Sequence, residues 1–135
     1  MALRLGTTCR NNACNGIVDT IDQGAGAGTI RVYTGAQPAA VSDNPSGTAL
    51  GTLTFSDPAF GNAATGVATA SAITSDIFAD NSGTAAHFAI YDSDVNALMD
   101  GDAAQGSGTM NFDNATIVAG GVIAISAMTV TVPIS

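Results

Sequence analysis

The chain has 135 residues, and only 10% of them are charged, compared with about 25% in a typical soluble domain. Residues 1–31 carry three arginines and two aspartates, a net charge of +1, whereas residues 32–135 carry nine aspartates and no base, a net charge of −9. Because an acidic body repels a phosphate backbone, this composition argues against nucleic-acid binding.

The length suits a single domain. With no lysine and no glutamate, the surface must be covered largely by Thr, Ser, Asn, Gly and Ala. Such a surface suits a protein that stays packed against others, and a small secreted β-domain is the alternative. No apolar segment of a signal peptide follows Arg4, which predicts a protein that is made and kept in a cytoplasm or built into something assembled there.

One helix is predicted near the N-terminus. Apolar residues recur with a period near 3.6 at Ala13, Cys14, Ile17, Val18 and Ile21. Thr7 or Thr8 is expected to cap the start of this helix, and Gly24 is expected to end it. We therefore expect residues 1–28 to form an N-terminal arm with a short helix that lies on a sheet, and residues 29–135 to form a β-sandwich.

From residue 29 onward the apolar pattern changes to a period of two, which is typical of strands. The expected strands are 29–35, 49–57, 65–74, 84–92, 97–101, 109–114 and 121–133. Their inward-facing side chains are expected to include Ile30, Val32, Leu53, Phe55, Phe88 and Ile90. The strand 65–74 places only alanines on one face, which would allow a neighbouring layer to approach closely.

Turns or loops are expected between these strands at 35–47, 57–61, 80–83, 93–96 and 101–108, where Gly, Pro, Asn and Asp gather. About seven short strands with turns every 8–12 residues favour an all-β fold. The predicted fold is an antiparallel, jelly-roll-like sandwich of about seven to eight strands, with one short N-terminal helix.

One segment has the length of a membrane span and another has part of the EF-hand ligand spacing, but the residues of each disfavour that interpretation. Residues 116–134 hold no charge and are long enough to cross a bilayer, yet their two adjacent glycines and β-branched alternation favour a buried strand. Asp92, Asp94 and Asn96 have the spacing of the first three EF-hand ligands. Because alanines occupy the positions of the required glycine and glutamate, a hairpin tip is favoured over a cation site.

The sequence predicts no catalytic, cofactor-binding or metal-binding residue, and we expect the protein not to be an enzyme. A catalytic triad would need His87, the only histidine, together with an acid such as Asp92 or Asp94. Nothing near His87 suggests this arrangement, so His87 is expected at the surface or at an interface. Cys9 and Cys14 are expected to be reduced, and they lie about 140° apart around a helix, which is unsuitable for clamping one metal.

Five segments resemble, in style and order, a group of small structural proteins encoded beside the major capsid protein of tailed bacteriophages. They are TIRVYTGAQPA, LTFSDPAFG, GVATASAITSD, SGTAAHFAIYDSD and IVAGGVIAISAMTVTVP. The likeness covers roughly residues 10–133 and is greatest to the cement, or decoration, proteins. It implies a jelly-roll-like protein that dimerises on the outside of the capsid and bridges neighbouring capsomers. The segments CRNNAC and SDVNA depart from the pattern, the second because it lacks the glycine expected in its turn.

This resemblance implies a structural virion protein that is made in the host cytoplasm and located on the capsid exterior. Its expected partners are the major capsid protein and a second copy of itself, with no cofactor, nucleic acid or membrane. The candidate contacts to the capsid are Arg4, Arg10 and Arg31, which could dock on an acidic partner. Loops 35–47 and 101–108 are candidates for reaching a neighbouring subunit.

A carbohydrate- or receptor-binding β-module of a phage fibre or a bacterial surface is the competing hypothesis, and it predicts exposed aromatic residues in a concave site. The sequence has no tryptophan and only two tyrosines, which counts against this hypothesis.

A small hydrolase is a third hypothesis. Paired aspartates could serve glycoside hydrolysis, but no motif supports this.

Overall fold

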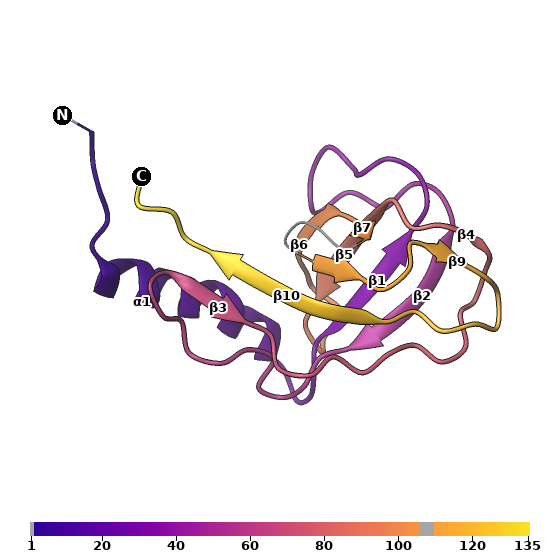
Figure 1. Cartoon of the computed structure of the whole chain (residues 1–135), viewed down its shortest axis with the longest axis horizontal. Helices are drawn as coiled ribbons and strands as arrows, with labels where there is room; N and C mark the ends of the chain where they lie inside the picture. The colour runs from indigo at the N-terminus through magenta and orange to yellow at the C-terminus, as the bar shows by residue number, and fades with distance from the viewer. Residues whose placement is uncertain (1, 106–109) are drawn as a thin grey trace.

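The computed structural model describes residues 2–105 and 110–135. Within these residues the protein is mostly β, with one short α-helix (Figure 1). The helical elements are α1 (Thr7–Asp19) and the 3₁₀-helix η1 (Thr20–Asp22). The strands are β1 (Thr29–Tyr33), β2 (Ala49–Thr54), β3 (Val67–Thr69), β4 (Gly83–Thr84), β5 (His87–Tyr91), β6 (Ala97–Asp102), β7 (Ala104–Gln105), β8 (Met110–Phe112), β9 (Thr116–Ile117) and β10 (Ile125–Thr131). The expectation of a mostly-β chain with one short N-terminal helix is confirmed.

The strands form two four-stranded sheets and one two-stranded sheet. Strand order is β2-β1-β5-β6 in the first sheet and β3-β10-β8-β7 in the second, and β4 pairs with β9. The pairing is antiparallel except between β7 and β8, which run parallel. The antiparallel expectation therefore holds for all but this short pair.

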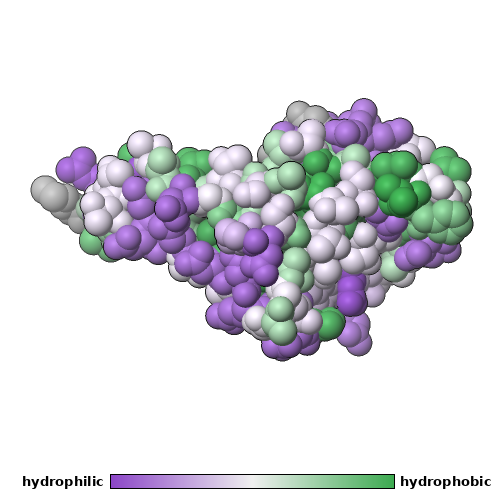
Figure 2. All heavy atoms as spheres, turned by 90° about the horizontal axis from the view of Figure 1, so that it is seen from below, coloured by the Kyte–Doolittle hydropathy of each residue, from purple (hydrophilic) through white to green (hydrophobic). Residues whose placement is uncertain are grey.

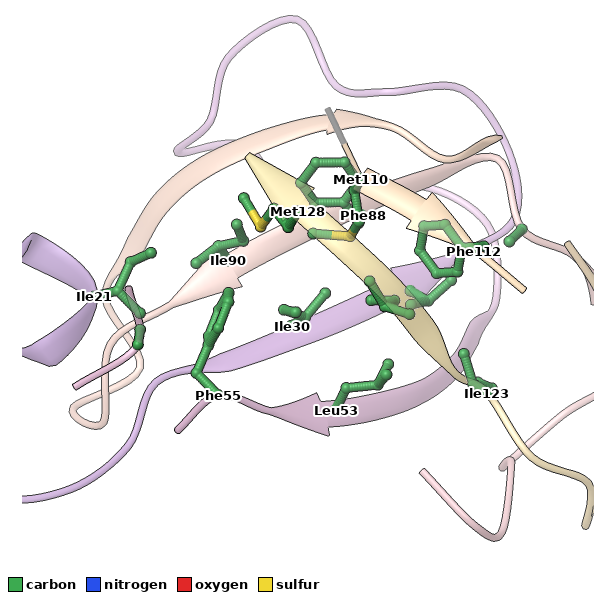
Figure 3. Packing of buried hydrophobic residues seen from close by; sticks show 14 of the residues in the cluster. Ile21, Ile30, Leu53, Phe55, Phe88, Ile90, Met110, Phe112, Ile123 and Met128 are labelled. Atoms are coloured by element: carbon green, nitrogen blue, oxygen red, sulfur yellow. The ribbon is translucent and has the colours of Figure 1, made fainter. Parts of the chain in front are cut away.

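Both four-stranded sheets contribute side chains to one hydrophobic core (Figure 3). The expected inward positions are all buried: Ile30, Val32, Leu53, Phe55, Phe88 and Ile90. Met110, Phe112 and Met128 of the second sheet belong to the same cluster. Full burial of a side chain of this size stabilises the fold by roughly 1.5–3 kcal/mol, so this core is the main source of stability.

Helix α1, β3 and the end of β10 form a lobe that projects from the rest of the molecule, and both termini lie there (Figure 1). We call this part the terminal lobe. Side chains of α1 bond to the backbone of its neighbours: Asn11 Oδ1 accepts from Gly66 N at 2.7 Å, and Asn15 Oδ1 accepts from Ala63 N at 2.8 Å. Leu5 N donates to the carbonyl oxygen of Ile134 at 2.7 Å, which ties the two ends of the chain together.

The prediction of the helix start was wrong. Helix α1 begins at Thr7, its N-cap is Gly6, and no side chain caps it. The apolar repeat marks only the part of the helix that faces the core, whereas the first turns are held by polar bonds to residues 63–66. The buried face is also narrower than expected, because Ala13 and Ile17 are exposed.

The strand predicted at 65–74 is much shorter in the structure. Beyond β3, Ala70 N still donates to Met128 O, but Ser71 N donates to Ala59 O, so the chain leaves β10 there. Of the expected alanine face only Ala68 is fully buried, and Ala72 is exposed. The alternation of apolar and polar residues continues in the sequence beyond the point where β3 separates from β10. The strand predicted from this alternation is therefore too long.

Two further predictions at the C-terminal half need correction. The expected loop 101–108 is partly strand, since β6 extends to Asp102 and β7 takes Ala104–Gln105, while its residues 106–108 lie outside the described residues. The strand predicted at 121–133 is β10, Ile125–Thr131, preceded by a turn at the paired glycines. Its place in the sheet confirms a strand, but the segment is buried only in part, since within β10 only Ile125 and Met128 are buried. In the described part of the chain, no helix has the length and apolar character that crossing a membrane requires.

Candidate interaction surfaces

Four large apolar side chains are exposed together at one end of the molecule. They are Ile77, Phe78, Val118 and Val122, with exposed fractions of 77%, 72%, 64% and 60%. We call them the tip patch. Figure 2 shows apolar residues gathered at the end that lies away from the termini. Contiguous exposed apolar side chains of this kind mark interaction sites in soluble proteins.

The tip patch is built on two paired segments, 76–79 and 120–123. Ala79 N donates to Gly121 O at 2.8 Å, and Gly120 N donates to Ala79 O at the same distance. Gly120 has a positive φ of 80°, and a side chain placed there would reach the Phe78 ring. The backbone of one segment therefore supports the exposed ring of the other.

Asp76 fixes the segment that carries Ile77 and Phe78. Its carboxylate accepts hydrogen bonds from Thr52 N of β2 at 2.9 Å and from Phe78 N at 3.0 Å. Because these bonds hold the backbone along β2, the two apolar side chains are directed away from the core. The segment that carries Ile77 and Phe78 is thus attached to β2 by side-chain hydrogen bonds.

A second exposed apolar group lies at the other end of the molecule, in the terminal lobe. Leu3 and Ile134 are both exposed, and together with Ala2, Arg4, Leu5 and Gly6 they line an open hollow of about 510 Å³. We call Leu3, Arg4 and Ile134 the terminal patch. It combines apolar surface with one exposed cation.

The three arginines expected to contact a capsid lie in different environments. Arg4 is exposed in the terminal patch. Arg10 is half-buried, and its Nε donates to the carbonyl oxygen of Val132 at 2.9 Å. Arg31 is also half-buried, and its guanidinium lies 4.6 Å from the centre of the Tyr91 ring. The fold does not bring the three together, and their contact role stays a prediction.

His87 is fully buried, so the expectation of a surface or interface histidine was wrong. Its ring stacks on Tyr33 with 5.2 Å between centroids and 14° between planes. Its Nδ1 lies 3.1 Å from the carbonyl oxygen of Gly35, so we assign the proton to Nδ1. The loop 35–47 crosses this outer face of the first sheet, where Gln37 Nε2 donates to Asp100 Oδ1 at 2.7 Å. This loop covers side chains that strand alternation alone leaves at the surface.

Tyr91 lies in the same covered layer as His87. Its hydroxyl oxygen is 3.5 Å from that of Tyr33. Burial, followed by the neighbouring Tyr33, raises the pKa of Tyr91 to about 12, because ionisation would place a charge in a poorly hydrated site. Among the described residues, the Nε2 of His87 has no hydrogen-bond partner.

The segment 92–96 is a hairpin turn between β5 and β6, as expected. Asp92 Oδ1 accepts from Asp94 N at 3.0 Å and from Asn96 N at 2.9 Å, and Asp92 Oδ2 accepts from Asn96 Nδ2 at 2.9 Å. The Asn96 side chain, followed by its backbone N–H, lowers the pKa of Asp92. Val95 takes the left-handed conformation, with φ of 66°, at the turn that lacks the expected glycine.

Neither cysteine is paired in the structure. Cys14 is buried and its Sγ donates to the carbonyl oxygen of Val130 at 3.3 Å, whereas Cys9 is exposed. Within residues 2–105 and 110–135, no group of three or more His, Cys, Asp or Glu side chains is arranged to hold a metal ion. Cys14 thus serves as a contact between α1 and β10.

Sequence reasoning missed the tip patch. The signal that could have found it is the apolar pair Ile77-Phe78, in a segment that no predicted strand or turn covered. Val118 and Val122 were included in the uncharged segment expected to be a buried strand, and both are exposed. Comparisons of the chain with protein-family models, with curated proteins and with solved structures found no match.

Proposed function

We propose that this protein is a structural component of a tailed-phage virion, which binds the outer surface of the capsid and bridges neighbouring major capsid subunits. The observation that supports this best is the presence of two exposed apolar patches at opposite ends of an elongated molecule. A protein that bridges two subunits needs two separate contact surfaces. The tip patch and the terminal patch meet this need.

The patches are suited to contacts that are individually weak. Burying one large apolar side chain contributes roughly 1.5–3 kcal/mol at most, and association costs several kcal/mol of lost freedom. A capsid presents many equivalent sites close together, so a molecule held at one end binds at the other with a high effective concentration. Modest patches at both ends therefore suffice for stable attachment.

Charge favours the outer surface of the capsid over the inner one. Residues 32–135 carry nine aspartates and no base, and packaged DNA would repel them. The only exposed arginine among the three candidates, Arg4, lies in the terminal patch. Arg4 is therefore the arginine best placed to meet an acidic group of a capsid subunit.

We further infer that the two four-stranded sheets form a jelly-roll-like sandwich and that the protein acts on the capsid as a homodimer. The shared hydrophobic core of the two sheets supports the first inference. The resemblance of the five segments to decoration proteins supports the second. Cross-linking of the protein on intact particles checks the dimer directly, because a bridging dimer gives a product of twice the chain mass.

The test uses capsids assembled from the major capsid protein of the proposed phage, and measures how much of this protein co-sediments with them. Phe78→Ser and Leu3→Ser each remove one exposed apolar side chain, so both variants are expected to fold normally and to bind at least tenfold more weakly. Val95→Ser is the matched control, because Val95 is exposed but lies in neither patch and outside loops 35–47 and 101–108. Unchanged binding of both patch variants would refute the proposed contacts.

Failure of the wild-type protein to bind any capsid would refute the function itself. Glycan-array binding in the absence of capsid association would instead support the carbohydrate-binding module. In that case Phe78→Ser should weaken glycan binding, because a carbohydrate-binding module uses exposed aromatic side chains and the Phe78 side chain is 72% exposed.

A further inference from the structure

Strands at the edge of a sheet expose unpaired backbone groups, and proteins usually cover them. The β2 edge of the first sheet is covered by residues 74–81. Thr54 pairs with Thr74, the Asp76 carboxylate accepts from Thr52 N, and Asn81 Nδ2 donates to Ala49 O at 2.8 Å. This edge has no room for another strand.

The β3 edge of the second sheet is covered as well. Gly61 N donates to Thr69 O at 3.2 Å, and Ala64 pairs with Val67. At the opposite edge of that sheet, β7 comprises Ala104–Gln105 within the described part of the chain. Neither edge offers the length of backbone that a docked strand requires.

Strand β6, Ala97–Asp102, is the remaining edge, and among the described residues no strand pairs with its outer side. It pairs only with β5 in the sheet order. Ala103 N donates to Ala86 O, in register with the β5–β6 ladder. Because alternate residues of an antiparallel strand direct their backbone groups to opposite sides, Asp100 and Asp102 direct theirs outward. Among the described residues, no backbone hydrogen bond reaches this outer side.

The side chains of β6 alternate in character as well. Gly101 lies against the Phe88 ring, and Met99 is opposite Ile90 in the register, so both are on the core side. Asp100 and Asp102 are on the outer face, opposite Ala89 and His87, and Asp100 also accepts a hydrogen bond from Gln37 Nε2 of loop 35–47. A strand added beside β6 would meet apolar neighbours on one face and carboxylates on the other.

We propose that β6 is a docking edge for an extended segment of another protein that carries basic and apolar side chains at alternate positions, and that this segment adds to the first sheet as a fifth strand. Backbone hydrogen bonds supply the affinity in this mode of recognition, and side chains supply the specificity. Opposite charges directly across two strands stabilise the pairing, whereas like charges destabilise it.

The charge pattern argues against a second copy of this chain at the same edge. Antiparallel pairing of two β6 strands would set aspartates against aspartates on the same face. The chain has only three basic residues, Arg4, Arg10 and Arg31, and no two of them are two positions apart. The matching strand must therefore come from a different protein. This inference does not depend on the proposed capsid function.

The test measures binding of a fluorescent pentapeptide, Arg-Val-Arg-Val-Arg with blocked ends, to the free full-length protein by fluorescence anisotropy. Two further peptides carry N-methyl groups either on the arginines or on the valines. In a docked strand, either the arginines or the valines direct their N–H groups to β6, but not both. N-methylation of that set removes the hydrogen bonds, so one methylated peptide should bind at least tenfold more weakly while the other binds like the parent. Equal binding of the two methylated peptides would overturn the proposal.

The charge requirement is tested with D100N/D102N, which should weaken binding of the parent peptide roughly fivefold to tenfold. The matched control is D57N/D113N, which removes the same charge from two exposed positions elsewhere and should have less than a twofold effect. Equal weakening by the two variants would show general attraction to an acidic surface and would overturn the proposal. Self-association of the wild-type protein that the parent peptide dissociates, measured by sedimentation velocity, would assign the edge to a second copy and also overturn the proposal.

Discussion

The Nε atom of Arg10 donates a hydrogen bond to the carbonyl oxygen of Val132 at 2.9 Å, across 122 positions of the chain. This contact joins the second turn of α1 to the residue that follows β10. Gly66, on the neighbouring segment, approaches the same guanidinium so closely that a side chain there would overlap it. The half-buried Arg10 therefore joins two backbone segments of the terminal lobe, in addition to the bonds made by Asn11 and Asn15.

Replacing Arg10 with alanine should destabilise the protein by about 1–3 kcal/mol, because the Val132 carbonyl loses a charge-assisted hydrogen bond and the lobe loses packing. The free energy of unfolding from urea titration measures this loss. Arg4→Ala is the matched control, and it should change stability by less than about 0.5 kcal/mol because Arg4 is exposed. Equal effects of the two substitutions would contradict a structural role for Arg10.

Gly66→Ala should also destabilise the lobe, by more than about 1 kcal/mol. Gly66 has a φ of 78°, which disfavours any side chain, and its added methyl group would meet the Arg10 guanidinium. Gly61→Ala serves as the control, since nothing lies within 4 Å of a side chain there. In the double variant R10A/G66A the loss should be smaller than the sum of the single losses, because the two residues are in contact.

Val95→Gly should stabilise the protein by about 0.5–1 kcal/mol. Val95 is exposed and takes a φ of 66°, and the left-handed conformation costs a β-branched residue about 1–2 kcal/mol that glycine avoids. The flexibility of glycine in the unfolded chain offsets part of the gain. Thermal unfolding measures the shift, and Val41→Gly, at an exposed position without positive φ, should not raise the melting temperature.

The raised pKa of Tyr91, about 12, should make the protein lose stability in alkali. The folded state holds the Tyr91 proton more tightly than the unfolded state, whose tyrosines ionise near pH 10. Stability is thus unaffected by this group below about pH 10 and falls as the pH rises from 10 through 12. The difference between the 295 nm absorbance titrations of wild type and Tyr91→Phe should show a midpoint near 12, and a midpoint near 10 would contradict the burial argument.

Strand alternation predicted the core of the fold well. Ile30, Leu53 and Phe88 are buried as expected because each pairs with a long strand in register. It failed where long-range contacts decide the outcome: His87 is buried by a loop that crosses the sheet, and the strand at 65–74 is cut short where β10 diverges. Neither event leaves a signal in the neighbouring residues.

The interaction surfaces were harder to predict than the core. The tip patch depends on the pairing of 76–79 with 120–123, which are more than forty positions apart. From charge alone, Arg4, Arg10 and Arg31 were all expected to contact the capsid. In the structure, Arg10 bonds to the Val132 carbonyl and Arg31 lies over the Tyr91 ring. Burial of a charged side chain by a distant backbone segment cannot be deduced from its position in the sequence.

Cryo-electron microscopy of phage heads is the most direct test of the proposed capsid function. Heads from phage with the intact gene should be compared with heads from phage in which the gene is deleted. We expect density of the size of this chain on the outer capsid surface, spanning neighbouring subunits and missing from the deletion heads. Identical outer surfaces in the two maps would contradict the proposal.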